Sequence, residues 1–234
     1  MSETVIHVAN LAKSYRRGGQ EVPVLVDIDL DVARGECVFL AGPSGSGKTT
    51  LLSILGCILS ADRGHVSLLG QDFATLTNRQ RTLLRRDQIG FVFQRFHLVR
   101  GLTALDNVCV PLQLRGERPR VARQRGQQLL EAVGLSDKMR SLPKNLSTGQ
   151  CQRVALARAL AADPEIILAD EPTASLDAAS GQEAMKLLRR LTTEHGKTAI
   201  VVTHDPRIFS FADRICHMEN GRLVHHEHIA DVAR

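Results

Sequence analysis

The sequence lacks most of the features that mark membrane-spanning, disulfide-stabilised or zinc-binding proteins. Its 234 residues include no tryptophan, one tyrosine and five scattered cysteines, no two of which form a C-x-x-C pair. We therefore expect reduced thiols and neither a disulfide framework nor a zinc site. No apolar run approaches the roughly 20 residues needed to cross a bilayer, and the first residues lack the basic and apolar regions of a signal peptide. These absences predict a cytosolic protein that reaches a membrane only through a partner.

Internal repeats and low-complexity segments are also absent, and the hydrophobic fraction of 43% is ordinary for a packed globular protein. The length allows one large domain, or one domain with an inserted lobe. The net charge of +5 fits nucleic acid, an anionic membrane surface or a phosphate-rich ligand. Arginines cluster at 79–86 and 115–125, and each cluster by itself indicates a solvated helix face.

One segment matches the phosphate-binding pattern G-x-x-x-x-G-K-[ST]: Gly42, Pro43, Ser44, Gly45, Ser46, Gly47, Lys48 and Thr49. An apolar run at 37–41 precedes it with strand character, and an apolar stretch able to form a helix follows at 50–55. Glycines allow successive backbone N–H groups to point inward, and the helix adds its positive N-terminal end. Lys48 can then reach the β- and γ-phosphates while the Thr49 hydroxyl ligates Mg²⁺. The segment predicts a nucleoside triphosphate site.

Two further apolar runs end in polar side chains. The run at 166–169 leads into Asp170 and Glu171, and the run at 198–203 leads into His204. Near-continuous apolar runs of this kind are typical of strands buried on both faces of a parallel sheet. At a strand tip aimed at the phosphate loop, Asp170 would hold Mg²⁺ and Glu171 would polarise an attacking water. His204 could hydrogen-bond the γ-phosphate.

The organisation along the chain is α/β. Strand patterns occupy 5–8, 22–26, 28–32 and 66–69, and a second group of strands lies at 89–93, 166–170 and 198–203. Between 96 and 164 the pattern is helical, with helices expected at 118–133 and 148–162. We therefore expect one domain, with a nucleotide-binding core at about 1–93 and 164–234 and an inserted helical lobe at about 94–163.

The helix expected at 148–162 has a strong N-terminal signal in Ser147, a good cap residue. Its first turn is a second anion-binding helix N-terminus, about a hundred residues after the phosphate loop. One nucleotide cannot easily use both termini of one subunit. The economical arrangement is a head-to-tail pair of subunits, each offering this helix to the ATP of the other.

Taken together, these motifs resemble the ATP-binding subunit of an ABC transporter over nearly the full length. The family's P-loop corresponds to 42–49, its Q-loop glutamine to Gln94 and its signature to Leu146, Ser147, Thr148, Gly149 and Gln150. Its second acidic motif corresponds to 166–171, its D-loop to 174–177 and its switch histidine to His204. Tyr15 stands at the position of the aromatic residue that stacks on adenine in this family.

The resemblance implies a P-loop ATPase core with an N-terminal antiparallel β subdomain and an inserted helical subdomain. It implies ATP and Mg²⁺ as cofactors, and it assigns catalysis to Glu171, His204, Lys48 and Gln94 and the metal to Thr49, Gln94 and Asp170. The implied nucleotide contacts are Tyr15, the loop 42–49, Thr50, the signature residues Ser147, Thr148, Gly149 and Gln150, and Asp177. The implied partners are a second copy of the chain and an integral membrane permease, with no nucleic acid, at the cytoplasmic side of the inner membrane.

The sequence departs from the family pattern at two places. Thr148 replaces a glycine of the usual LSGGQ, and Cys151 replaces a common arginine or lysine. Both departures concern the ATPase rate and not the fold. The amino-acid sequence at 94–98, 102–108 and 212–223 is similar to that of the subgroup that serves lipoprotein release, macrolide export and heterocyst-type glycolipid export. The chain stops soon after Arg222, so we expect no regulatory domain of the kind found in sugar importers.

Two other functions are weighed against that of a transporter subunit. A soluble ABC-type ATPase acting on nucleic acid or the ribosome would also fit the basic charge, although such proteins usually have two P-loop units or long coiled coils. A small-molecule kinase would leave the signature helix unexplained.

The segment His225-His226-Glu227-His228 has metal-ligand spacing, but without a rigid frame it is expected to be a solvated terminus.

Overall fold

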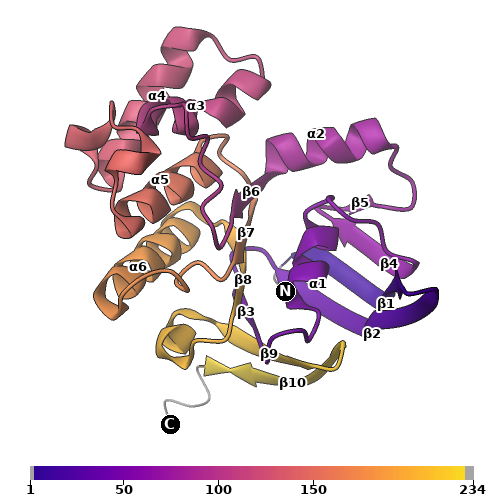
Figure 1. Cartoon of the computed structure of the whole chain (residues 1–234). Helices are drawn as coiled ribbons and strands as arrows, with labels where there is room; N and C mark the ends of the chain where they lie inside the picture. The colour runs from indigo at the N-terminus through magenta and orange to yellow at the C-terminus, as the bar shows by residue number, and fades with distance from the viewer. Residues whose placement is uncertain (1–2, 230–234) are drawn as a thin grey trace.

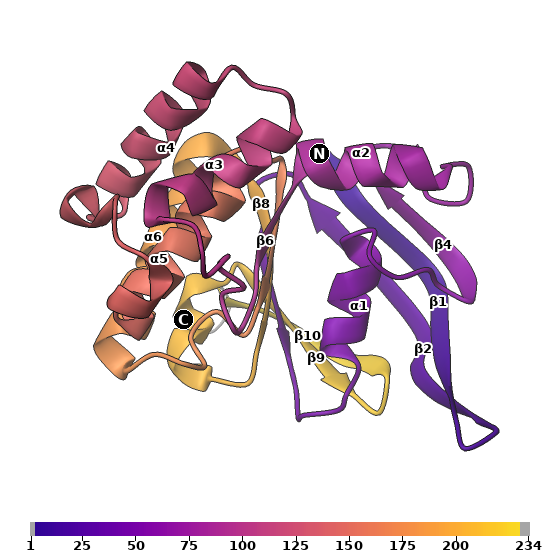
Figure 2. The same cartoon turned by 45° about the horizontal axis from the view of Figure 1, so that its top comes forward.

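The computed structural model describes residues 3–229, which form two sheets with helices around them (Figures 1 and 2). An antiparallel sheet has the order β2-β1-β4-β5 and consists of β1 (Thr4–Arg17), β2 (Gln20–Ala33), β4 (Arg63–Leu68) and β5 (Gln71–Asp72). The second sheet has the order β10-β9-β3-β8-β7-β6. Its strands are β3 (Cys37–Ala41), β6 (Ile89–Val92), β7 (Ile166–Asp170), β8 (Thr198–Thr203), β9 (Arg214–Glu219) and β10 (Arg222–His228). The predicted antiparallel N-terminal sheet and parallel central strands are confirmed.

The helices are α1 (Lys48–Leu55), α2 (Asn78–Gln88), α3 (Ala104–Leu114), α4 (Pro119–Ala132), α5 (Thr148–Leu160) and α6 (Ala178–His195). Short 3-10 segments occupy Ser136–Lys138, Pro143–Asn145 and Pro206–Phe211. The helices predicted at 118–133 and 148–162 correspond to α4 and α5. In Figure 1, α3, α4 and α5 gather on one side of the large sheet, while α1 lies on the other side with the antiparallel sheet.

The structure adds to two sequence expectations about the strands. The runs 22–26 and 28–32 are one strand, β2, which pairs with β1 on both sides of Asp27. The register of that pairing shifts at Asp27, whose backbone is left-handed with φ 47. The histidine segment 225–228, expected to be a solvated terminus, is the end of strand β10, which pairs with β9 in antiparallel fashion and leaves its three histidines exposed. Neither feature has a local sequence signal, because a bulge and a pairing partner are set by the neighbouring strand.

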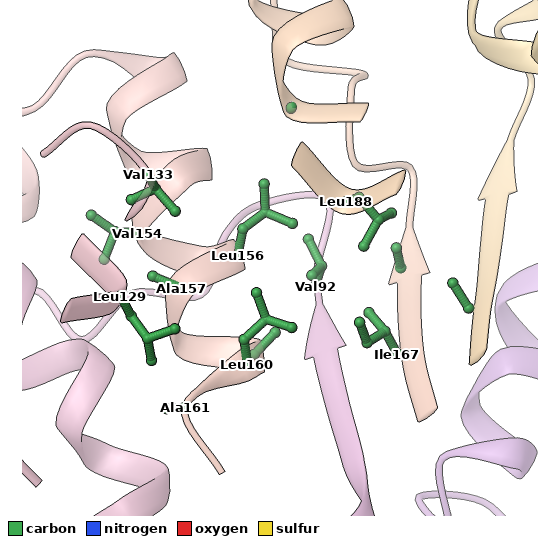
Figure 3. Packing of buried hydrophobic residues seen from close by; sticks show 14 of the residues in the cluster. Val92, Leu129, Val133, Val154, Leu156, Ala157, Leu160, Ala161, Ile167 and Leu188 are labelled. Atoms are coloured by element: carbon green, nitrogen blue, oxygen red, sulfur yellow. The ribbon is translucent and has the colours of Figure 1, made fainter. Parts of the chain in front are cut away.

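The large sheet separates two hydrophobic cores, and alternate residues of its strands face each of them. In β3, Val38 and Leu40 face α1 and the antiparallel sheet, whereas Phe39 faces the helical side. In β7, Ile167 likewise belongs to the helical core, where Figure 3 shows it near Leu160 of α5. Because both faces of the large sheet are covered, its central strands consist of continuous apolar runs, as the sequence indicated.

Helix α5 lies directly on β6, and Gly90 permits this approach. A β-carbon at Gly90 would lie 2.3 Å from the Ala159 carbonyl oxygen and 3.0 Å from Cγ of Pro164. The first contact is with backbone, so a side chain at this position would push the end of α5 away from the sheet. Gly90 thus fixes how closely the helices of the insertion pack on the core.

We expect Gly90→Ala to lower the free energy of unfolding by about 1–3 kcal/mol through overpacking, measured by urea denaturation. Gly101→Ala is the matched control, because a β-carbon there has nothing within 4 Å and no positive φ. This control should change stability by less than about 0.5 kcal/mol. Equal effects of the two substitutions would contradict the close approach of α5 to β6.

Candidate functional site

The phosphate loop between β3 and α1 is held against the backbone of both sheets. A β-carbon at Gly42, whose φ is 150, would lie 2.1 Å from the carbonyl oxygen of Met218 in β9. At Gly47, with φ 102, it would lie 2.7 Å from the carbonyl oxygen of Val24 in β2. Both positions require glycine, for conformation and for space. The sequence pattern therefore marks a loop whose shape is set by two distant strands.

The N-terminus of α1 is arranged to receive an anion. Gly47 precedes the helix and supplies no side-chain cap, and the first turn contains no acidic residue. The first N–H groups of α1 are thus left for a ligand, at the positive end of the helix dipole. The Lys48 ammonium lies inside the loop and donates to the carbonyls of Gly42 and Pro43 at 2.8 and 2.7 Å. Burial lowers the pKa of Lys48, while the charges of Glu171 and Asp170 oppose this shift.

The tip of β7 carries the predicted metal ligand. The Thr49 hydroxyl donates to Oδ1 of Asp170 at 3.1 Å, so a helix hydroxyl and a strand carboxylate converge at the phosphate loop. Burial raises the pKa of Asp170, while the hydrogen bond from Thr49 and the charge of Lys48 oppose this shift. A hydroxyl and a carboxylate are the oxygen ligands that Mg²⁺ uses beside nucleotide phosphates. These residues therefore fit a magnesium nucleotide.

Glu171, the next residue, lies under His204. Its Oε1 is 2.7 Å from Nδ1 of the histidine, which is mostly exposed. Its other carboxylate oxygen, Oε2, is buried and has no hydrogen-bond partner within residues 3–229. Glu171 has a φ of 48, unusual for a residue with a β-carbon, and its N–H is held by the Val202 carbonyl at 2.9 Å. An orphaned carboxylate oxygen, held by strained backbone beside Lys48, is suited to orient a water molecule.

A cleft of about 680 Å³ brings these groups together. Its lining includes most of the residues predicted to bind and hydrolyse the nucleotide: Tyr15, Pro43, Ser44, Gly45, Gly47, Lys48, Thr49, Thr50, Gln94, Asp170, Glu171 and His204. Tyr15 is 41% exposed at the cleft edge, and the Lys13 ammonium lies 5.8 Å from the centre of its ring. Gly42 and Ser46 belong to the loop but do not line the cleft, and Ser46 is buried beneath it.

The signature residues are not part of this cleft. Ser147 and Gly149 line a separate cleft of about 600 Å³, together with residues of α4, α5 and α6. The Ser147 hydroxyl accepts from the Gln150 N–H at 3.2 Å, and the Gln150 side chain accepts from the Ser147 N–H at 2.9 Å. This capping box leaves Gln150 engaged in holding the helix start. Thr148 occupies the first helical position of α5.

Asp177, also predicted to contact the nucleotide, caps α6 instead. Its carboxylate accepts from the N–H of Ser180 at 3.0 Å and from the Ser180 hydroxyl at 2.7 Å. A β-carbon at Gly149 would lie 3.3 Å from that same hydroxyl. Within one chain, the start of α6, which Asp177 caps, therefore lies beside the signature, and neither Asp177 nor the signature lines the P-loop cleft.

Sequence reasoning missed two classes of site residue. Val24 and Val202 line the nucleotide cleft as ordinary apolar strand residues, which nothing in their local sequence distinguishes from core. A second group forms a largely apolar groove of about 530 Å³ between α2, α3 and α5. The groove is lined by Thr82, Arg85, Arg86, Ile89, Gly90, Phe91, Phe93, His97, Pro111, Leu114, Arg158, Ala159 and Ala162. Aromatic residues spaced by two in a strand were the available signal for it.

The histidine-rich hairpin does not form a metal centre. His217 and His225 face each other with ring centroids 5.9 Å apart, and Nδ1 of His226 is 3.1 Å from Sγ of Cys216 on the other face. Over residues 3–229, no group of three or more His, Cys, Asp or Glu side chains is placed to hold a metal ion. All five cysteines are unpaired, as expected. Within the same range, no helix has both the length and the apolar character needed to cross a membrane.

Comparisons with known proteins agree with this geometry. The family model described as ABC transporter matches residues 25–174. The chain is 45% identical over 224 residues to the macrolide export ATP-binding/permease protein MacB of Vibrio parahaemolyticus, covering 96% of this chain and 34% of the relative. The corresponding protein of Salmonella typhimurium is 44% identical over 221 residues, with the same 34% of the relative covered. The chain thus spans about a third of the length of these curated relatives.

Among solved structures, the ATP-binding cassette MJ0796 in a dimeric, post-hydrolysis state bound to ADP and Pi is 40% identical, with a TM-score of 0.90. That match covers 96% of this chain and 98% of the other. CbiO1 from Clostridium perfringens, part of the transporter complex cbiONQ, is 28% identical with a TM-score of 0.87. The cleft, the family model and the structural match agree, and the chain belongs to the ABC transporter family.

Proposed function

We propose that this chain is the ATPase motor of a MacB-like export system and that two copies close head-to-tail over two ATP molecules. The observation that carries the proposal is the separation of the signature from the P-loop cleft within one chain. Two helix N-termini suited to anions then act on one nucleotide only if they come from different subunits. The dimeric form of the related cassette MJ0796 supports this arrangement.

In the proposed site, Tyr15 stacks on adenine, and the loop N–H groups with Lys48 bind the phosphates. Thr49 and Asp170 hold Mg²⁺, with Gln94 at the cleft edge as a further ligand. When bound, Mg²⁺ neutralises charge on the β- and γ-phosphate oxygens. Glu171 orients the attacking water, and His204 holds the Glu171 carboxylate and reaches toward the γ-phosphate.

The signature and Asp177 complete the site from the partner copy. Ser147, Thr148, Gly149 and Gln150 present the start of α5 to the γ-phosphate, while Asp177 holds the start of α6 beside them. ATP promotes closure only if it binds the closed pair more tightly than the open one. Hydrolysis removes that difference in affinity, so the pair reopens.

The apolar groove between α2, α3 and α5 is the proposed attachment site for an integral membrane permease. The MacB relatives support this assignment, because their names combine ATP-binding and permease functions in one protein. We place the chain at the cytoplasmic face of the inner membrane. The nucleotide-binding core at about 1–93 and 164–234 and the helical lobe at about 94–163 would move relative to each other, with the groove lined from both.

Glu171→Gln should retain ATP binding and reduce hydrolysis about 100-fold or more, because it removes the carboxylate that orients water. Phosphate release and calorimetric ATP binding measure the two effects separately. Glu194→Gln, an exposed substitution in α6, is the control and should leave both unchanged. Turnover by Glu171→Gln at the wild-type rate would refute the assignment of Glu171.

Tyr15→Ala should weaken ATP binding by about 1 kcal/mol through lost stacking, whereas Tyr15→Phe should bind nearly as wild type. Inorganic triphosphate, which has no base, provides the comparison ligand. If Tyr15→Ala weakens ATP and triphosphate equally, the tyrosine does not contact adenine.

The head-to-tail arrangement predicts complementation between two inactive variants. Ser147→Arg blocks the signature, and Lys48→Ala removes the charge facing the phosphates, so each homodimer is inactive. A mixed dimer has one site with both lesions and one with neither. Equal mixtures should recover about a quarter of wild-type turnover, because about half of randomly formed dimers carry one intact site of two. Absence of recovery under conditions in which wild-type subunits exchange would contradict the model.

A further inference from the structure

Arg158 connects α5 to the loop that carries Gln94. It lies near the C-terminal end of α5, and its two terminal nitrogens donate to successive carbonyls: Nη1 to His97 and Nη2 to Phe96, both at 2.6 Å. No acidic side chain of residues 3–229 forms an ion pair with this guanidinium. Burial lowers its pKa, so the charge is held in a partly desolvated place without a compensating carboxylate. Desolvating a charged guanidinium without an acidic partner costs free energy. Its presence here therefore indicates that the two hydrogen bonds it donates serve a function.

The two carbonyls belong to an unusual stretch of backbone. Phe96 and His97 are consecutive and both left-handed, with φ of 59 and 48, although neither is glycine. This conformation is unfavourable for residues with a β-carbon and persists only where surrounding contacts impose it. The Phe96 N–H donates to the Phe93 carbonyl at 2.9 Å, which closes the turn after β6. The left-handed pair turns its two carbonyls toward α5, where the planar Arg158 guanidinium donates a hydrogen bond to each of them.

Gln94 lies two residues before Phe96 and lines the nucleotide cleft. No side-chain hydrogen bond of Gln94 is present in the part of the chain that the structure describes, so its direction depends on the backbone around it. A second anchor holds the far end of the same loop: the fully buried Asn107 of α3 accepts from the Val99 N–H at 2.7 Å. Arg158 differs from Asn107 because it comes from the helix that begins with the signature.

We propose that Arg158 is a positioning residue for ATP hydrolysis: by clamping the Phe96 and His97 carbonyls it directs Gln94 into the nucleotide cleft and ties the position of Gln94 to that of α5. The inference rests on the proposed role of Gln94 at the nucleotide. It accounts for the left-handed pair and for a half-buried cation that lines the groove and bonds to the loop carrying Gln94. Because a helix is stiff along its axis, a shift of the signature end of α5 would also move the loop that carries Gln94.

The test is a double-mutant cycle on the basal ATPase activity of the chain. Arg158→Met removes both hydrogen-bond donors and retains much of the side-chain length. Gln94→Ala removes the side chain that Arg158 is proposed to position. Arg158→Met should lower kcat about tenfold or more with the KM for ATP within about twofold, since misplacement of a catalytic group affects turnover more than binding. It should also raise the Mg²⁺ concentration that gives half-maximal rate. The double variant should be no slower than Gln94→Ala, because the two substitutions damage one function.

Arg81→Met is the matched control, because Arg81 donates to the Phe73 carbonyl at 2.7 Å on the far side of α2. It should leave kcat unchanged. If Arg158→Met does not fold, Arg158→Lys enters the same cycle, since an ammonium retains the charge but cannot donate in a fork. If Gln94→Ala alone has no effect on kcat, the proposed role of Gln94 is overturned. If Gln94→Ala slows turnover and the two effects multiply, the role of Gln94 stands and the positioning role of Arg158 is overturned.

Discussion

The nucleotide site depends on the close contact between the phosphate loop and the backbones of two different sheets. Gly42 touches β9, Gly47 touches β2, and the Gly221 N–H donates to the Ser46 carbonyl at 3.2 Å. The loop is thereby fixed from both sides by contacts within the chain. Prepared N–H groups at the start of α1 can then bind phosphate without reorganising. The antiparallel sheet, remote from the chemistry in sequence, is needed because it forms one wall of this contact and supplies Tyr15.

A second constraint concerns the helices of the insertion. Helix α5 has the signature at its start, packs on β6 at Gly90 near its end, and reaches the Gln94 loop through Arg158. One stiff element therefore contacts the sheet, the groove and the loop at the cleft edge. In the proposed dimer, the partner's nucleotide and a permease at the groove would act on the same helix. This gives a physical route by which closure of two cassettes and movement of a permease can be linked.

The sequence predicted the parts of the site whose chemistry is local. Lys48 and Thr49 follow glycines at fixed spacing, Asp170 and Glu171 end an apolar strand, and Ser147 caps a helix. Each pattern contains its own structural context. The cleft brings Lys48, Thr49, Asp170 and Glu171 together. The structure places Ser147 elsewhere, as the two separate helix N-termini had suggested.

Features formed by distant segments could not be predicted in this way. The bulge at Asp27, the strand made by the histidine segment and the carbonyl clamp of Arg158 depend on what lies opposite in space, and each residue is ordinary in its own stretch. Gln150 and Asp177 illustrate the same limit. Their residue types suit a ligand contact, but within the chain their side chains are engaged in helix caps.

In the proposed dimer, each chain contributes its phosphate loop to one catalytic site and its signature to the other. The most direct measurement is ATP turnover per chain as a function of chain concentration, at saturating ATP and Mg²⁺. If the active site is shared between two copies, turnover per chain should rise with concentration and level off as the pair saturates. Turnover per chain that stays constant down to concentrations at which light scattering finds only monomers would contradict the account.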